Sequence, residues 1–103
     1  MGKEVVHHFK EERATLRKEQ SFSGWTSCLL SCDTNSIIAT KKKDCNEPWY
    51  QFMIERLWIS KVYRLHKKRY IFGIAYDKKK YQLGFEEEAT CARIHGIVIN
   101  LIR

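Results

Sequence analysis

The sequence of 103 residues predicts an α+β fold: a three-stranded antiparallel sheet packed on one C-terminal helix, with an N-terminal helical arm. Two observations in the C-terminal half predict the sheet and its helix. Residues 70–76 alternate with a period of two and place bulky side chains on one face, as a strand does. After Gly84 the apolar spacing changes to three and four, which is the spacing of a helix. An apolar stripe within residues 3–19 predicts the helical arm.

The arm is the first element along the chain. Its stripe is thin, so we expect the helix to lean on the rest of the protein rather than to form the core. The sequence "SFSG" at residues 21–24 breaks it. The members of the stripe are Val5, Val6, Phe9, Arg13 and Leu16.

Two short apolar segments follow the arm. "WTSCLLSC" (25–32) and "SIIAT" (36–40) are rich in apolar or β-branched residues and are predicted to pair as strands around the turn "DTN". The polar connector "KKKDCNE" comes next. We therefore assign residues 1–47 to an arm and cover segment, and residues 48–103 to a module of sheet and helix.

The segment "PWYQFMIERLW" begins at Pro48, the single proline of the chain, and fits two structures. A helix capped near Asn46 would gather Trp49, Phe52, Met53 and Leu57 on one face. A strand would alternate Tyr50, Phe52 and Ile54 equally well. We favour the helix slightly.

The C-terminal half reads as three strands and a helix. "SKVYRLH" (60–66), "YIFGIAYD" (70–77) and "KYQLG" (80–84) are the strands, joined by the basic turns "KKR" and "DKK". Three glutamates, Glu86 to Glu88, then occupy the first turn of the helix, where negative charge suits the helix dipole.

The helix has two apolar faces. Ala89, Ala92 and Gly96 form a small-residue face, which we expect to lie close over the sheet. A small sheet cannot also cover the second face, so either residues 48–58 or a protein partner covers it. The residues of this second face are Ile94, Ile97, Val98 and Leu101.

Residues 61–80 carry the whole excess of positive charge. They hold eight Lys or Arg residues and one acid, Asp77, so their net charge of +7 equals that of the chain. The bases gather in two turns at opposite ends of one strand, about 25 Å apart at ~3.3 Å per residue. Charge of nearly one sign indicates an acidic partner, because mixed charge would serve solubility as well.

The order of these elements resembles the Apetala-type DNA-binding domain of plant ethylene-response factors and apicomplexan transcription factors. The residues that carry the resemblance are "KKRYIFGIAYDKKKYQLGFEEEATCARI", within about residues 60–99, and "GFEEEA" is closer to the apicomplexan form. The resemblance implies that the sheet lies in the DNA major groove and that outward side chains read base edges.

The outward positions of the middle strand depart from that pattern. Ile71, Gly73 and Ala75 cannot make bidentate base contacts, so we expect phosphate and shape recognition, with Ile71 and Ala75 meeting a protein instead. The candidate nucleic-acid-binding residues are Lys61, Arg64, His66, Lys67, Lys68, Arg69, Lys78, Lys79, Lys80 and Gln82.

No sequence motif indicates an enzyme or a cofactor. The chain has no P-loop, no HExxH and no Ser-His-Asp order. Cys28 and Cys32 have a CxxxC spacing that His7 and His8 could complete as a zinc site, but no second close pair supports a metal. We predict buried thiols in a reducing, intracellular compartment. No apolar run is long enough to span a membrane, and no signal peptide is present.

These observations predict a non-enzymatic nucleic-acid-binding protein. The favoured partner is RNA, with the chain as a small ribonucleoprotein component, such as a protein of a ribosome, including a mitochondrial one, beside neighbouring proteins. The alternative is a nuclear Apetala-type DNA-binding regulator. A protein-interaction module without nucleic acid is a third possibility.

Overall fold

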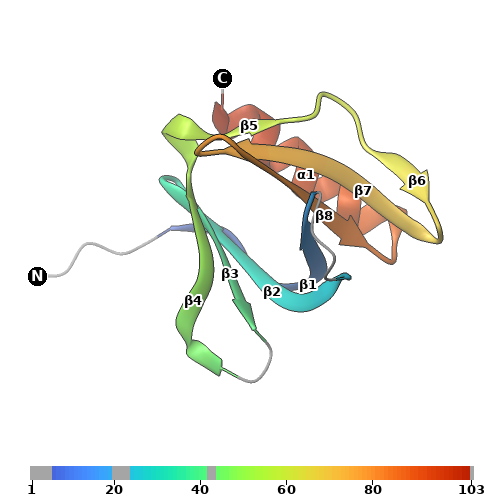
Figure 1. Cartoon of the computed structure of the whole chain (residues 1–103). Helices are drawn as coiled ribbons and strands as arrows, with labels where there is room; N and C mark the ends of the chain where they lie inside the picture. Colours follow the sequence, from blue (N-terminus) through green and yellow to red (C-terminus); the bar gives the residue numbers. More distant parts are fainter. Residues whose placement is uncertain (1–5, 20–23, 42–43, 103) are drawn as a thin grey trace, which may run out of the picture.

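The computed structural model describes residues 6–19, 24–41 and 44–102, and within them the chain forms eight strands, a short 3₁₀ helix and one α-helix (Figure 1). The elements are β1 (His7–Lys18), β2 (Thr26–Asp33), β3 (Ser36–Lys41), β4 (Asp44–Met53), η1 (Ile54–Arg56), β5 (Trp58–Ile59), β6 (Arg64–His66), β7 (Arg69–Tyr76), β8 (Lys79–Phe85) and α1 (Glu88–Ile102).

All the described strands belong to one antiparallel sheet in the order β4-β3-β2-β1-β8-β7-β5, and β6 pairs with β7 beyond the end of β5. The expected three-stranded sheet is therefore wrong. The three strands predicted in the C-terminal half exist as β6, β7 and β8, but β1 pairs with β8 and joins them to the first four strands. The predicted boundary between residues 47 and 48 falls inside β4.

The sheet curls so that its two ends face each other. β4 is distant from β7 and β8 in the strand order, yet the ring of Phe52 lies 5.3 Å from those of Tyr76 and Tyr81. Tyr50 of β4 lies 5.2 Å from Tyr81. These aromatic contacts fill the space between the two halves, which Figure 1 shows crossing each other. The core therefore lies inside one curved sheet.

The predicted N-terminal helix is wrong, because residues 7–18 form strand β1. A β-bulge explains the misleading pattern: the register shifts between Phe9 and Glu12, and Glu11 has a left-handed φ of 53°. An extra residue in a strand reverses which face the following side chains occupy. Phe9 and Leu16 are thus both buried although they are seven residues apart, which is also the spacing of two helical turns. Val5 lies outside the described residues.

The preference for a helix after Pro48 is also wrong, since this segment continues β4 to Met53. The strand alternative describes it: Phe52 and Ile54 are buried and Tyr50 packs against the core. A single helical feature, η1, follows at Ile54–Arg56. The spacing of the aromatic side chains fits both a helix and a strand, so tertiary packing decides between the two structures.

Helix α1 caps the core with the face opposite to the one expected. Its buried residues are Cys91, Ile94, His95 and Val98. Ala89 is exposed, and a Cβ added to Gly96 would meet no atom within 4 Å, so the expected close approach of the small-residue face is wrong. No helix within the described ranges combines the length and apolar character that a membrane span requires.

His95 fastens the helix to the loop after β5. Its Nε2 lies 2.7 Å from the Ser60 carbonyl oxygen, and this nitrogen carries the hydrogen, because a carbonyl can only accept. Phe72 and Tyr63 pack edge-on against the imidazole ring. This contact holds residues 60–63 between the helix and β7.

Candidate functional site

Two tight basic turns close the two ends of β7. The last pairs are His66 with Arg69 and Tyr76 with Lys79, so each turn has two residues between its strands. Positive φ values occur at all four turn positions, which is the backbone of a type I′ hairpin turn. The residues and their φ values are Lys67 47°, Lys68 66°, Asp77 50° and Lys78 61°.

Lysine is an unusual choice for these positions. The left-handed region costs a residue with a Cβ about 1–2 kcal/mol, which is why such turns favour Asn-Gly and Asp-Gly. Asp77 suits the first position of its turn, but Lys78 stands where glycine would relieve strain. Residues kept in costly conformations are a sign of functional use, and here they keep charge at the tips of the hairpins.

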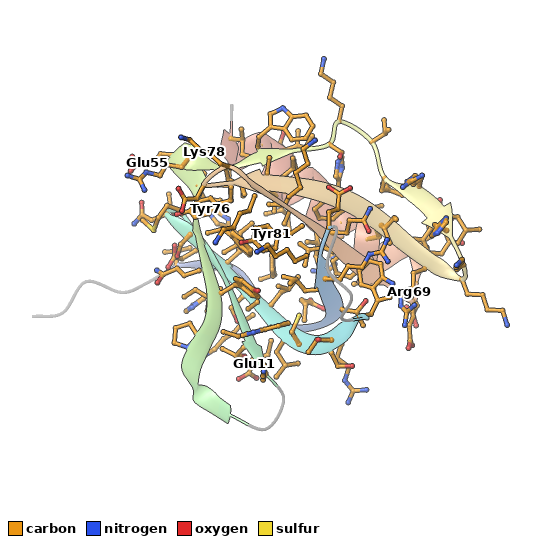
Figure 2. All side chains as sticks on the ribbon, in the orientation of Figure 1. Glu11, Glu55, Arg69, Tyr76, Lys78 and Tyr81 are labelled. Atoms are coloured by element: carbon orange, nitrogen blue, oxygen red, sulfur yellow. The ribbon has the colours of Figure 1, made fainter. Side chains whose placement is uncertain are left out.

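The β7–β8 turn forms one wall of a basic hollow. The end of β1 lies beside the start of β8, with Lys18 in register with Tyr81 and the Glu19 amide donating to the Lys80 carbonyl at 2.9 Å. The hollow has a volume of about 370 Å³. Figure 2 labels Lys78 at this end of the hairpin, together with Tyr76 of β7. Its lining residues are Lys18, Glu19, Lys78, Lys79 and Lys80.

Sequence reasoning identified three of these lysines and missed Lys18. Lys78, Lys79 and Lys80 are exposed, as the predicted basic turn requires. Lys18 lies within the helix predicted for residues 3–19, and only its pairing with β8 brings it to the hollow. Among the described residues the one ion pair joins Arg93 and Glu12, so the lysines of the hollow have no acidic partner there.

The other predicted basic residues lie at the opposite end of β7. Lys61, Arg64 and His66 are exposed on and before β6. Lys67 and Lys68 form the β6–β7 turn, and Arg69 is half-buried. Gln82 is buried, and its Oε1 accepts a hydrogen bond of 2.7 Å from Arg17 Nε, so it is engaged within the protein.

The predicted protein-contact residues separate into three groups. Ile71 and Ala75 lie on the face of β7 that points away from the core, with Phe72 and Ile74 on the core side. Ile94 and Val98 are in the core of the chain itself, so they are closed to a partner. Ile97 and Leu101 are partly buried against that core.

A stacked arrangement of arginine and tryptophan covers the outer face of β1 and β8. The guanidinium carbons of Arg17 and Arg69 lie 4.8 Å and 5.2 Å from the ring centre of Trp25. The indole sits directly on Gly84, where an added Cβ would come within 3.2 Å of Trp25 and 2.9 Å of Thr15 Oγ1. Any larger residue at 84 would displace the stack.

The described cysteines behave as core residues. Cys28, Cys32 and Cys91 are free and buried, and burial raises the pKa of each thiol to about 11. Such thiols stay protonated near neutral pH and are poor nucleophiles and ligands. Within the described ranges, no group of three or more His, Cys, Asp or Glu residues is placed to hold a metal ion.

The comparison with solved structures gives the fold. The chain superimposes on the crystal structure of the pleckstrin homology domain of ArhGAP27 with a TM-score of 0.73 and 10% sequence identity, over 95% of this chain and 100% of that one. This chain has the pleckstrin homology fold. No family model matches its sequence. No curated protein matches it either.

This likeness overturns the resemblance to the Apetala-type domain. That domain predicted three strands and a helix, whereas the pleckstrin homology fold accounts for nearly the whole chain, with the strands before residue 60 as part of the same sheet. The two predicted functions are wrong as well: nothing in the comparison supports nucleic-acid binding, either as a ribonucleoprotein component or as a DNA-binding regulator.

Proposed function

We propose that this protein is a binding module that attaches to anionic membrane surfaces by holding a phosphorylated lipid headgroup in the basic hollow beside the β7–β8 turn. The observation that carries the proposal is the convergence of Lys18, Lys78, Lys79 and Lys80 on one concavity. The pleckstrin homology fold, which suggests a lipid-binding or protein-binding module, supports it.

The chemistry of the hollow suits phosphate. An ammonium group offers three donors and a compact charge, and several lysines around one concavity can contact more than one phosphate. The single acid in the lining is Glu19, so the lysines outnumber it by four to one. A bilayer adds the surface potential of its anionic lipids, which attracts each nearby base by about 1 kcal/mol.

Vesicle co-sedimentation tests the proposal. The protein is mixed with vesicles of phosphatidylcholine alone, of phosphatidylcholine with phosphatidylserine, and of phosphatidylcholine with phosphatidylinositol bisphosphate. We expect little binding to the first, weak binding to the second, and the strongest binding to the third. Equal binding to the three vesicles would contradict the proposal.

A soluble competitor separates the headgroup from the bilayer. Inositol trisphosphate in solution should release the protein from the bisphosphate vesicles, because it fills the same hollow. If inorganic sulfate at equal ionic strength released the protein from the vesicles as well, binding would depend on the surface charge as a whole, which salt screens, and not on the hollow.

Replacing Lys78 with glycine should raise stability and weaken vesicle binding together. Gly accepts the φ of 61° without steric cost, so the free energy of unfolding should rise by about 0.5–1 kcal/mol in urea titrations, after the greater freedom of glycine in the unfolded chain is subtracted. The loss of one lysine should weaken binding about fivefold.

The matched control is Lys78→Gln, which removes the same charge and keeps a Cβ in the turn. It should weaken binding to the same extent and leave stability unchanged. A glycine variant that is more stable and binds vesicles as tightly as the parent would show that Lys78 takes no part in the site.

A further inference from the structure

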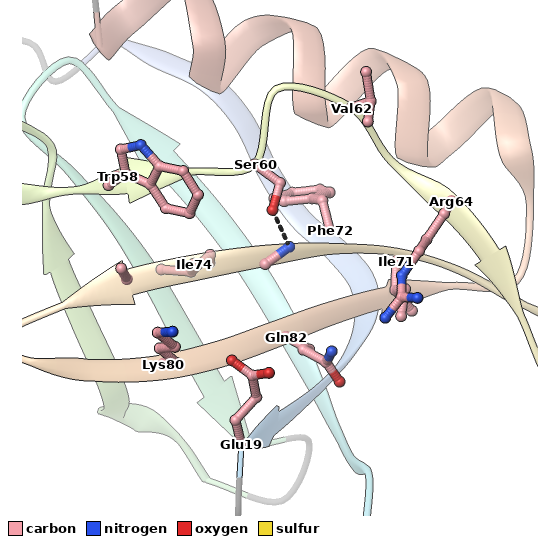
Figure 3. Close-up of a pocket in the computed structure, with 12 residues that line it drawn as sticks. Glu19, Trp58, Ser60, Val62, Arg64, Ile71, Phe72, Ile74, Lys80 and Gln82 are labelled. Atoms are coloured by element: carbon pink, nitrogen blue, oxygen red, sulfur yellow. Dashed lines mark hydrogen bonds between the residues drawn. The ribbon is translucent and has the colours of Figure 1, made fainter.

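A second concavity lies on the outer face of the sheet, away from the core. It is a groove of about 350 Å³ that runs along β7 between β8 and the segment from Trp58 to Arg64. Figure 3 shows Trp58 and Lys80 toward one end of the groove and Arg64 toward the other. It shares Glu19 and Lys80 with the basic hollow and is otherwise separate from it.

The path of the chain after β5 creates the groove. Ser60 is the last residue of that segment held against β7: its amide donates to the Gly73 carbonyl at 3.0 Å, and its Oγ accepts from the Gly73 amide at 3.1 Å. Pairing resumes only at Arg64 with Ile71, so the residues between them bow away from β7. The His95 contact to the Ser60 carbonyl holds this bow in place.

The floor and rims of the groove are apolar. Ile71, Gly73 and Ala75 share the outer face of β7 and form the floor; Ile71 is almost fully covered, with 2% of its surface exposed, so Gly73 and Ala75 provide the open part. Trp58 and Val62 line the groove while 59% and 73% of their surfaces face solvent. Large apolar side chains left open beside a recess mark a binding surface.

The charged residues around the groove are mostly basic. Register places Arg64 next to Ile71 and Lys80 next to Ala75, so each end of the floor carries a cation. Arg17 and Arg69 lie on the same outer face, over Trp25. Glu19 is the one acid in the lining, and in the described part of the chain none of these cations makes an ion pair.

We propose that this outer-face groove binds an extended, acidic segment of a partner protein, which inserts one apolar side chain over Gly73. Charge complementarity carries the choice of partner: the apolar floor is bracketed by Arg64 and Lys80. Ile71 and Ala75 are four residues apart, which is ~13 Å along a strand. In an extended peptide, residues i, i+2 and i+4 face the same way over that distance.

The geometry therefore specifies a sequence pattern: acid, any residue, apolar residue, any residue, acid. The two carboxylates meet Arg64 and Lys80, and the apolar side chain lies between Trp58 and Val62. A recess of about 350 Å³ can take up a side chain, whereas the flat surface of a bilayer would leave it unfilled. The inference goes beyond the headgroup site, with which the groove shares only Glu19 and Lys80; Trp58, Val62, Arg64 and the floor on β7 lie outside that site.

Selection from a random peptide library displayed on phage, with the whole protein as bait, tests the proposal. We expect enrichment of peptides with two acids at i and i+4 around an apolar residue. A fluorescein-labelled copy of the enriched peptide should bind in anisotropy titrations. Trp58→Ala and Arg64→Glu should each weaken it by about 10-fold or more. Both residues are exposed, so the fold should tolerate these changes.

The control variants are Lys78→Gln with Lys79→Gln, which change the headgroup hollow and not the groove. They should leave peptide binding within about 2-fold of the parent. Selection of no peptide, selection of peptides without acids, or a peptide that binds Arg64→Glu as well as the parent would each overturn the proposal. If Trp58→Ala and Arg64→Glu weaken vesicle binding and leave peptide binding intact, the face meets a membrane and the proposal is likewise wrong.

Discussion

Replacing Phe52 with alanine lowers the free energy of unfolding by about 3–5 kcal/mol, the range for removing a fully buried aromatic side chain. Phe52 is 1% exposed and is among the largest completely buried side chains. Its ring touches Tyr76 and Tyr81 across the core and stacks on Tyr50 at 5.8 Å. The cavity left behind would separate the two halves of the curled sheet. The total free energy of unfolding of a small domain is ~5–15 kcal/mol, so this loss would remove a large part of it.

Urea titration followed by far-UV circular dichroism measures the effect. Trp58→Ala is the matched control, since it removes a larger aromatic side chain that is 59% exposed. We expect it to cost less than about 1 kcal/mol. Similar losses in the two variants would contradict the placement of β4 over β7 and β8.

The double variant Lys78→Gln and Lys79→Gln should bind vesicles containing phosphatidylinositol bisphosphate about 30-fold less tightly than the parent. Each lysine near an anionic surface contributes about 1 kcal/mol, so the loss of two corresponds to ~2 kcal/mol. Both side chains line the basic hollow and are exposed. Among the described residues, neither lysine forms an ion pair with an acid. Glutamine keeps a side chain of similar length, so the shape of the turn is preserved.

The chain provides its own control at the other end of β7. Lys67→Gln with Lys68→Gln removes the same charge from a turn of the same backbone type. If binding depends on the hollow, this variant should stay within about 3-fold of the parent at physiological salt, where charges farther apart than ~8 Å are screened. Equal losses in the two double variants would show that net charge, and not the hollow, governs binding.

The C-terminal half could be predicted from local patterns. The alternation at Phe72 and Ile74, the charged residues in the two turns, and the glutamates at the start of α1 each depend on residues close in sequence. The structure has β7, β8 and α1 in these places. The correct elements nevertheless suggested the wrong family, because a short sheet followed by a helix is common to unrelated folds.

The candidate site could be predicted only in part. Lys78, Lys79 and Lys80 form a visible charge cluster in the sequence, but Lys18 is remote from them and joins them through the β1–β8 pairing. The groove is less visible still: Trp58, Ile71 and Lys80 come from three strands, and the bow between Ser60 and Arg64 that opens it leaves no periodic signal.

By itself, the sequence determined the hairpin of β7 and β8, its charged turns and the presence of the last helix, since these follow from neighbouring residues. Tertiary structure alone decided that β1 and β4 are strands and which face of α1 is buried. The bulge at Glu11 shifts the phase of β1, and the aromatic residues of β4 suit either period until Tyr76 and Tyr81 pack against them. Pairing between distant strands brings Lys18 to the other lysines, and no local pattern encodes such pairing.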